Sequence, residues 1–151
     1  MTSIWWTNCP PSAGSKRPVS KVVLDASALL ALVHGEPGQD LVAAFVAEAT
    51  ISAVNLAEVI GKLAERGVPL ERAKAIALSF GVEVISLDTE LAAAAGQLRP
   101  ATRSAGLSLG DRCCLATAMA LRLPVLTTEA ICEPLANELG VEVRNIRPRE
   151  H

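Results

Sequence analysis

The chain has 151 residues, of which half are hydrophobic but only 3% aromatic, and its formal net charge at pH 7 is −2. This length suits one domain with a core of aliphatic side chains. The charge excludes a protein that holds nucleic acid by bulk positive charge alone, and no apolar run reaches the roughly 18 residues of a membrane span. We therefore expect a soluble, cytoplasmic protein that does not contact a membrane.

The first twenty residues are rich in Pro, Ser and Gly and show neither a helical nor a strand period. They also lack the long apolar stretch of a secretory signal. Regular patterning begins at Lys21. We therefore expect a flexible N-terminal tail over residues 1–20 and one folded domain over residues 21–148.

Short apolar runs alternate with helical patterns along the predicted domain. In chain order the pattern predicts a strand at Lys21–Asp25, helices at Ser27–His34 and Gln39–Ala49, a strand at Thr50–Ala53, helices at Val54–Arg66 and Leu70–Phe80, a strand at Val82–Leu87, a helix at Thr89–Leu98, a loop at Pro100–Leu107, a helix at Gly110–Leu121, a strand at Pro124–Thr127, a helix at Glu129–Leu139 and a strand at Val141–Ile146. This alternation is typical of a three-layer α/β domain with a mostly parallel sheet flanked by helices.

Several common catalytic motifs are missing from the sequence. No GxGxxG follows the first strand, no GxxxxGK[ST] precedes a helix, and no GxSxG elbow follows a predicted strand. The only histidines are His34 and His151, which leaves little for a Ser-His-Asp triad or a histidine-rich metal site. Carboxylates are therefore the main candidates for chemistry.

Three acids follow predicted strands. Asp25 ends the first strand, Glu129 follows the strand PVLTT, and Asp88 follows the strand VEVISL. Each has a structural alternative: Asp25 and Asp88 can cap the next helix, and Glu129 can be a first-turn acid favoured by the helix dipole. Because sites in open parallel sheets form beyond the carboxyl ends of strands, Asp25 and Glu129 are also candidate site residues. We interpret Asp88 as a cap.

Two further acids lie on predicted helices. Asn55, Glu58 and Lys62 share one helix face, so Glu58 either pairs with Lys62 on a solvated stripe or points with Asn55 at a polar site. Ser108 and Asp111 fit a capping pattern at the start of a helix whose next residues are apolar or small. A carboxylate at a buried helix start is costly without a partner, so Asp111 is also a candidate site residue.

The four candidate acids cannot converge unaided, because like charges about 4 Å apart repel by about 4 kcal/mol at an effective dielectric of 20. A cluster needs a cation or shifted pKa values. Hard oxygen ligands fit Mg²⁺ or Mn²⁺, and a carboxylate-held Mg²⁺ supports attack of water on a phosphodiester. This chemistry predicts a metal-dependent nuclease.

The runs VVLDASALLAL, SAVNLAEVIGKL and LSLGDRCCLATAMALRLPVLTTE, in this order and spacing, resemble the PIN-domain family and within it the VapC toxins of bacterial toxin–antitoxin pairs. The resemblance covers about residues 21–148. It implies a parallel sheet between helices and an endoribonuclease with one or two Mg²⁺ ions that cuts structured RNA such as tRNA. It further implies a homodimer and an antitoxin that blocks the site.

The resemblance also implies roles for particular residues. Asp25, Glu58 and Asp111 match the family's acids, whereas its usual fourth acid, Asp, is replaced here by Glu129. All four are predicted as catalytic and metal-binding. Ser27, Asn55 and Thr127 are predicted to support the site, and Arg112 to contact RNA unless it forms an ion pair on the helix surface. Two alternatives remain open: a catalytically weak PIN-like module that binds RNA or protein, and a phosphoryl hydrolase with Asp25 as nucleophile, although Ser27 stands where such enzymes carry a second acid.

Overall fold

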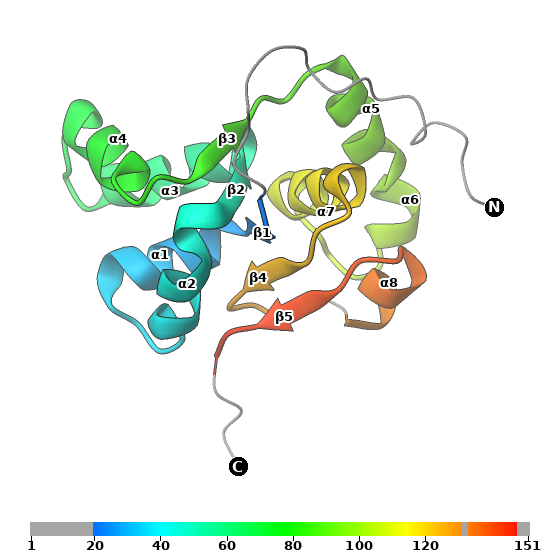
Figure 1. The fold of residues 1–151 in the computed structure, drawn as a ribbon. Helices are drawn as coiled ribbons and strands as arrows, with labels where there is room; N and C mark the ends of the chain where they lie inside the picture. The colour runs from blue at the N-terminus through cyan, green and yellow to red at the C-terminus, as the bar shows by residue number, and fades with distance from the viewer. Residues whose placement is uncertain (1–19, 131–132, 148–151) are drawn as a thin grey trace.

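A computed structural model describes residues 20–130 and 133–147 of the chain (Figure 1). Its elements in chain order are β1 (Val22–Leu24), α1 (Ala26–His34), α2 (Gln39–Phe45), the 3₁₀ helix η2 (Val46–Glu48), β2 (Ala49–Ser52), α3 (Ala53–Glu65), α4 (Leu70–Leu78), β3 (Glu83–Ile85), α5 (Thr89–Gln97), α6 (Arg99–Thr102), α7 (Leu109–Leu121), β4 (Val125–Thr127), α8 (Glu133–Glu138) and β5 (Val143–Asn145). None of these described helices is long and apolar enough to cross a bilayer.

The strands form one sheet in the order β3-β2-β1-β4-β5, and every pair in it is parallel. β1 lies at the centre, with Leu24 beside Ile51 of β2 and beside Leu126 of β4. Parallel neighbours need long crossover connections, which the helices between the strands provide. The predicted α/β fold with a parallel sheet is therefore confirmed.

Helices cover both faces of the sheet, as Figure 1 shows with α1–α4 on one side and α5–α8 on the other. The side chains of β1 explain this arrangement, because successive residues of a strand point to opposite faces. Val22 and Leu24 join a core with α1–α4, whereas Val23 joins a second core with α5, α7 and α8. A strand that is apolar on both faces is stable only at the centre of a three-layer domain.

Three predicted elements differ from the observed ones by more than two residues, and the others differ by at most two residues at either end. The predicted loop at Pro100–Leu107 begins with a short helix, α6, because a proline in the first turn of a helix leaves no hydrogen bond unmade. The predicted helix Gln39–Ala49 stops at Phe45, since Ala49 already pairs with Val22 in the sheet. The predicted helix Glu129–Leu139 is shorter: α8 spans Glu133–Glu138, and residues 131–132 lie outside the described part.

The predicted tail lies almost entirely outside the described residues, which begin at Ser20. Ser20 itself contacts the domain, with its hydroxyl 2.7 Å from that of Thr50 on β2. The end of the predicted domain, residue 148, is also outside the described part. The division into residues 1–20 and 21–148 therefore remains a prediction.

Candidate metal centre

The carboxyl ends of β1 and β4 meet at one edge of the sheet. Asp25 comes directly after β1, and its backbone N–H donates to the carbonyl of Leu126 on β4 at 3.0 Å. Thr127 ends β4, and Glu129 follows two residues later. Residues about 100 positions apart in sequence are thus neighbours, because the parallel register aligns the two strand ends.

Asp25 is a buried acid, with only 3% of its surface exposed. Its Oδ2 accepts hydrogen bonds from the hydroxyl of Ser27 at 2.7 Å and from that of Thr127 at 3.1 Å. Asp25 occupies the N-cap position of α1, yet its side chain makes no capping hydrogen bond there. The capping alternative therefore does not explain this carboxylate, which turns toward the sheet edge instead.

The two hydroxyls that bind Asp25 are themselves held in place. Ser27 Oγ accepts the backbone N–H of Thr128 at 3.0 Å and lies 3.2 Å from Thr127 Oγ1. Thr127 Oγ1 accepts the backbone N–H of Glu129 at 3.1 Å. This network fixes the loop after β4 against the start of α1, so that the acids on both segments stay on the same side of the sheet.

Asp111 lies in the first turn of α7 and forms a capping box with Ser108, as predicted. Its Oδ2 accepts the backbone N–H of Ser108 at 2.9 Å, and its own N–H donates to Ser108 Oγ at 3.1 Å. The side chain is half-buried, and the following turns of α7 are buried in the core, which confirms the predicted buried helix. The cap fixes the orientation of this carboxylate.

These segments bring three carboxylates together. One oxygen from each of Asp25, Asp111 and Glu129 lies within 4.8 Å of the other two. At such separations carboxylates repel each other strongly unless a cation or protons compensate the charge. The donors are all hard oxygens, which is the set that Mg²⁺ and Mn²⁺ prefer. The residues present therefore fit a divalent metal ion.

Glu58 lies near this cluster but outside the group of three. It projects from α3 into the same pocket, where its carboxylate lies against the backbone of Gly110 on α7. Asn55 donates to Glu58 Oε2 at 3.0 Å, whereas Lys62 is instead 3.5 Å from Glu65. The alternative of a Glu58–Lys62 surface pair is therefore wrong, and the pairing of Asn55 with Glu58 is confirmed.

Asn55 is completely buried and connects three elements. Its side-chain amide donates to Glu58 and to the carbonyl of Gly110 at 3.1 Å. Its Oδ1 accepts the hydroxyl of Ser52, which also caps α3 by accepting the N–H of Asn55. Ser52 was not among the predicted site residues, although the pattern of a strand-final serine three residues before Asn55 is a capping signal.

Burial is the main cause of the raised pKa values in the site. It raises the pKa of Asp25; the hydrogen bond from Ser27 opposes this, and the charge of Asp111 adds to it. Desolvation also raises the pKa of Glu58, against the hydrogen bond from Asn55. The pKa of Glu129 is raised by burial and then by the charges of the other acids. A cation at the cluster would relieve these unfavourable charges.

Two further predictions concern acids beside helices. Asp88 caps α5, since its Oδ1 accepts the N–H of Leu91 at 2.8 Å, which confirms its interpretation as a cap. Glu129 is not in a helix: α8 begins only at Glu133, so the alternative of a first-turn acid is wrong. The irregular backbone after β4 lets the Glu129 side chain reach the cluster.

Arg112 follows Asp111 but faces away from the acids. Its Nη1 donates to the carbonyl of Ala95 on α5 at 3.1 Å, and its Nε is buried without a hydrogen-bond partner in the described structure. The alternative of a surface ion pair finds no support among the described residues. Its contact with RNA remains a prediction, and the structure gives this side chain a different neighbour.

The acids line a pocket of about 490 Å³ that opens at the carboxyl edge of the sheet, bounded by α1, α3, the start of α7 and the loop after β4. Asp25 lies on its floor, whereas Glu58 and Glu129 lie on more exposed walls. The pocket has room for a hydrated ion and a phosphate group. A parallel sheet with acids converging beyond its strand ends defines the class as an α/β domain with a candidate metal site.

Residues 22–131 match the model of the PIN domain, and the chain therefore belongs to the PIN-domain family. Among curated proteins, none matches the sequence significantly. Solved structures give the same fold. The DNA-bound VapBC from Salmonella typhimurium aligns at a TM-score of 0.64 and 22% identity, over 84% of this chain and 98% of that one.

Two further solved structures agree. VapBC2 from Rickettsia felis, bound to a DNA fragment from its promoter, aligns at a TM-score of 0.63 and 17% identity, over 82% of this chain and 97% of that one. A toxin–antitoxin complex from Klebsiella pneumoniae aligns at a TM-score of 0.63 and 23% identity, over 85% of this chain and 100% of that one. At these identities the likeness shows the fold, and the predicted resemblance to PIN domains is confirmed.

Proposed function

We propose that this PIN-domain protein is a metal-dependent endoribonuclease that hydrolyses phosphodiester bonds in RNA, with tRNA as a candidate target. The observation that carries the proposal is the convergence of Asp25, Asp111 and Glu129 at the carboxyl edge of the sheet. Separate segments of chain place their acids in one pocket, where burial raises the pKa of Asp25. A fold that maintains such a cluster against repulsion gains from a bound cation.

In this mechanism Asp25, Asp111 and Glu129 would hold Mg²⁺ or Mn²⁺. When bound, the ion supplies positive charge to the phosphate oxygens and lowers the pKa of an attacking water. Ser27 and Thr127 keep Asp25 oriented, and the capping box keeps Asp111 oriented. Glu58 has one oxygen bound by Asn55, and no described residue donates a hydrogen bond to its other oxygen, which would accept one from water or hold the ion through water.

The biological setting is proposed from the solved relatives. The Klebsiella pneumoniae structure is described as a toxin–antitoxin complex. The Salmonella typhimurium and Rickettsia felis structures are described as VapBC, and a Mycobacterium tuberculosis structure is described as a member of the VapBC family of toxin–antitoxin systems. We propose that this chain is likewise the toxin of such a pair, acting in the cytoplasm as a homodimer and inhibited by a cognate antitoxin. Co-expression with the gene product encoded beside it tests the last point: growth arrest by this chain alone and rescue by the neighbour are expected.

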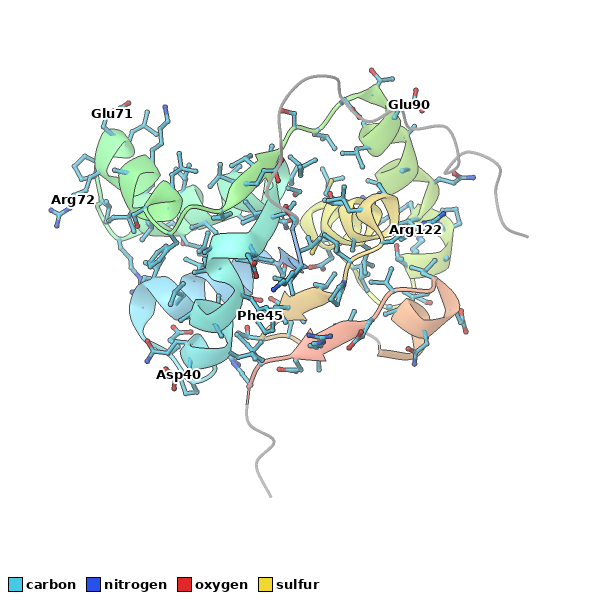
Figure 2. The ribbon with its side chains drawn as sticks, in the orientation of Figure 1. Asp40, Phe45, Glu71, Arg72, Glu90 and Arg122 are labelled. Atoms are coloured by element: carbon cyan, nitrogen blue, oxygen red, sulfur yellow. The ribbon has the colours of Figure 1, made fainter. Side chains whose placement is uncertain are left out.

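The nuclease activity is tested with purified protein and labelled total tRNA. We expect the wild type to cleave in Mg²⁺ and not in EDTA, and Asp25→Asn to be inactive in both. Asp40→Asn is the matched control, because Asp40 is an exposed acid at the outer edge of α2, away from the pocket (Figure 2). Equal cleavage by all samples would refute the proposal.

Two further measurements on the same proteins, RNA binding and trapping of a phosphorylated intermediate, separate the alternatives. RNA that binds tightly but stays intact in both Mg²⁺ and Mn²⁺ would favour the catalytically weak binding module. A covalent phosphate trapped on Asp25 would favour the phosphoryl hydrolase. The position of Glu129 within the cluster supports the nuclease over a decayed site, because its longer side chain still brings a carboxylate to within 4.8 Å of the other two acids.

A further inference from the structure

A second depression adjoins the acidic pocket. It has a volume of about 750 Å³ and lies between α1, the C-terminal half of α3, the loop after β4 and the end of β5. Ser27, Lys62 and Glu129 line both depressions, so the two form one continuous groove. A ligand with a group at the acids can therefore extend along this groove without leaving the surface.

The face of α3 that borders the groove changes sign along its length. Glu58, Lys62 and Arg66 follow one another at intervals of four residues, so they lie on the same side of the helix. Each interval advances about 6 Å along the helix axis. This step is comparable to the spacing of successive phosphates in an extended single strand. The helix thus presents an acid beside the metal centre and then two cations at regular distances from it.

The charge of Arg66 is not neutralised by an acid. Its Nη1 lies 3.3 Å from Nδ1 of His34, and an arginine can only donate, so the ring nitrogen accepts in this contact. No carboxylate of the described residues forms an ion pair with Arg66. Arg147, after β5, also lines the groove and has no ion pair within residues 20–130 and 133–147, and its charge lowers the pKa of Glu129.

The acids in this part of the groove do not cancel these cations. Glu65 is 3.5 Å from Lys62, and both side chains are more than 60% exposed, so this pair is weak and readily exchanged for a phosphate. Glu36 also lines the groove and has no ion pair among the described residues. Glu129 belongs to the metal cluster, where a bound cation would neutralise it.

We propose that Lys62, Arg66 and Arg147 bind the phosphates that flank the scissile one, so that the substrate strand runs from the acidic pocket along α3 toward its C-terminal end. This inference rests on the proposed nuclease function and assigns the path of its substrate. Arg66, at the end of α3, and Arg147, after β5, both line the groove and would contact the strand from two different elements. Phosphate contacts of this kind set position and affinity and carry no sequence information.

A purely structural role predicts a different result. Cations in the last turn of a helix interact favourably with the helix dipole and contribute about 0.3–1 kcal/mol to stability. Under that explanation, removing Lys62 and Arg66 lowers the melting temperature and leaves RNA binding unchanged. The experiment therefore measures both quantities.

The test compares Lys62→Gln/Arg66→Gln with Arg72→Gln/Lys74→Gln. The second pair removes the same charge from exposed positions on α4, and Figure 2 shows Arg72 at the outer edge of the molecule. Binding of a fluorescein-labelled single-stranded RNA of mixed sequence is titrated in Mg²⁺ over a series of salt concentrations. The titrations use the Asp25→Asn background, so that bound RNA stays intact. Melting temperatures are measured on the same samples.

The groove variant is expected to bind RNA at least tenfold more weakly. The slope of the logarithm of its association constant against the logarithm of salt concentration should become less steep by about 1.4, because two phosphate contacts of a single strand are lost. The α4 variant should keep the parent slope. Arg147→Gln should lower the slope by about 0.7. Equal slopes for both double variants would overturn the inference.

The outcome is distinguishable from a failure of the proposed function. If the wild type cleaves RNA but the groove and α4 variants bind alike, the path along α3 is wrong and the nuclease proposal stands. If the wild type does not cleave but the groove variant alone loses binding, the nuclease proposal fails and the groove remains a phosphate-binding site.

Discussion

The Asp25 carboxylate lies where water scarcely reaches it, and two hydroxyl donors compensate only part of the cost of its charge. In the absence of metal this charge opposes folding. We expect Asp25→Asn to unfold at a higher temperature than the wild type in EDTA, by about 1 kcal/mol or about 2–4 °C. Thermal unfolding followed by circular dichroism measures the melting temperatures of both proteins, with Asp40→Asn as control. A lower melting temperature for Asp25→Asn would show that the hydroxyls compensate the charge fully.

Ser27 determines how well Asp25 is oriented. Its hydroxyl donates to Asp25 and accepts from the backbone of Thr128, so Ser27→Ala removes both bonds at once. Mutation of a group that orients a metal ligand typically lowers metal affinity 10–100-fold. We expect Ser27→Ala to bind Mn²⁺ about tenfold more weakly in calorimetric titration. Ser104→Ala, on an exposed loop, should match the wild type, and equal affinities for all three proteins would remove Ser27 from the site.

At the scale of elements, the approach of α7 to α3 depends on Gly110. A Cβ at this position would meet the carboxylate of Glu58. Alanine is intrinsically better than glycine inside a helix by about 1 kcal/mol, so Gly110→Ala should keep or raise stability while it displaces Glu58. We therefore expect weaker cleavage at an unchanged or higher melting temperature.

Gly96→Ala on α5 is the control for this change, because a Cβ there meets no atom within 4 Å. It should raise stability without a change in cleavage. If Gly110→Ala cleaves as fast as Gly96→Ala, the position of Glu58 does not matter to the reaction.

The elements show what the sequence could and could not predict. The strand at Val22–Leu24 is recognisable because it is apolar on both faces and ends in an acid. The short helix α6 is not, because a proline marks both the end of one helix and the first turn of another. The sequence likewise could not predict that Glu129 lies outside a helix. Its backbone conformation depends on the hydroxyl of Thr127, which accepts the N–H of Glu129.

At the scale of the whole molecule, the candidate site could be predicted as a set of acids but not as a geometry. Asp25, Asp111 and Glu129 were each ambiguous with helix capping or dipole effects. Asp111 in fact forms a capping box and also lies in the cluster, so the two interpretations were never exclusive. The basic half of the groove could not be predicted, because Arg66 and Arg147 come together only through the parallel order of the sheet.

The acid cluster should also make stability depend on pH and metal together. The pKa values of Asp25, Glu58 and Glu129 are raised in the folded chain, so these groups bind protons more tightly there than in the unfolded chain. Their favourable contribution is complete below the ordinary carboxyl pKa of about 4 and is lost as pH rises through the folded values.

Once the carboxyl groups have lost their protons, a bound Mg²⁺ ion would compensate their negative charge instead. The difference in melting temperature between Mg²⁺ and EDTA should therefore grow as pH rises from about 4 to about 7. Differential scanning calorimetry across this range measures it. A difference that is constant or shrinks with rising pH would mean that the ion binds somewhere other than these carboxylates.

The account depends above all on a divalent cation bound by the converging acids. Titration of the purified chain with Mn²⁺, followed by electron paramagnetic resonance of the free ion, measures this directly. We expect the wild type and Asp40→Asn to bind Mn²⁺ alike, and Asp25→Asn and Asp111→Asn each to bind at least tenfold more weakly. Unchanged Mn²⁺ affinity in Asp25→Asn and Asp111→Asn would contradict the account.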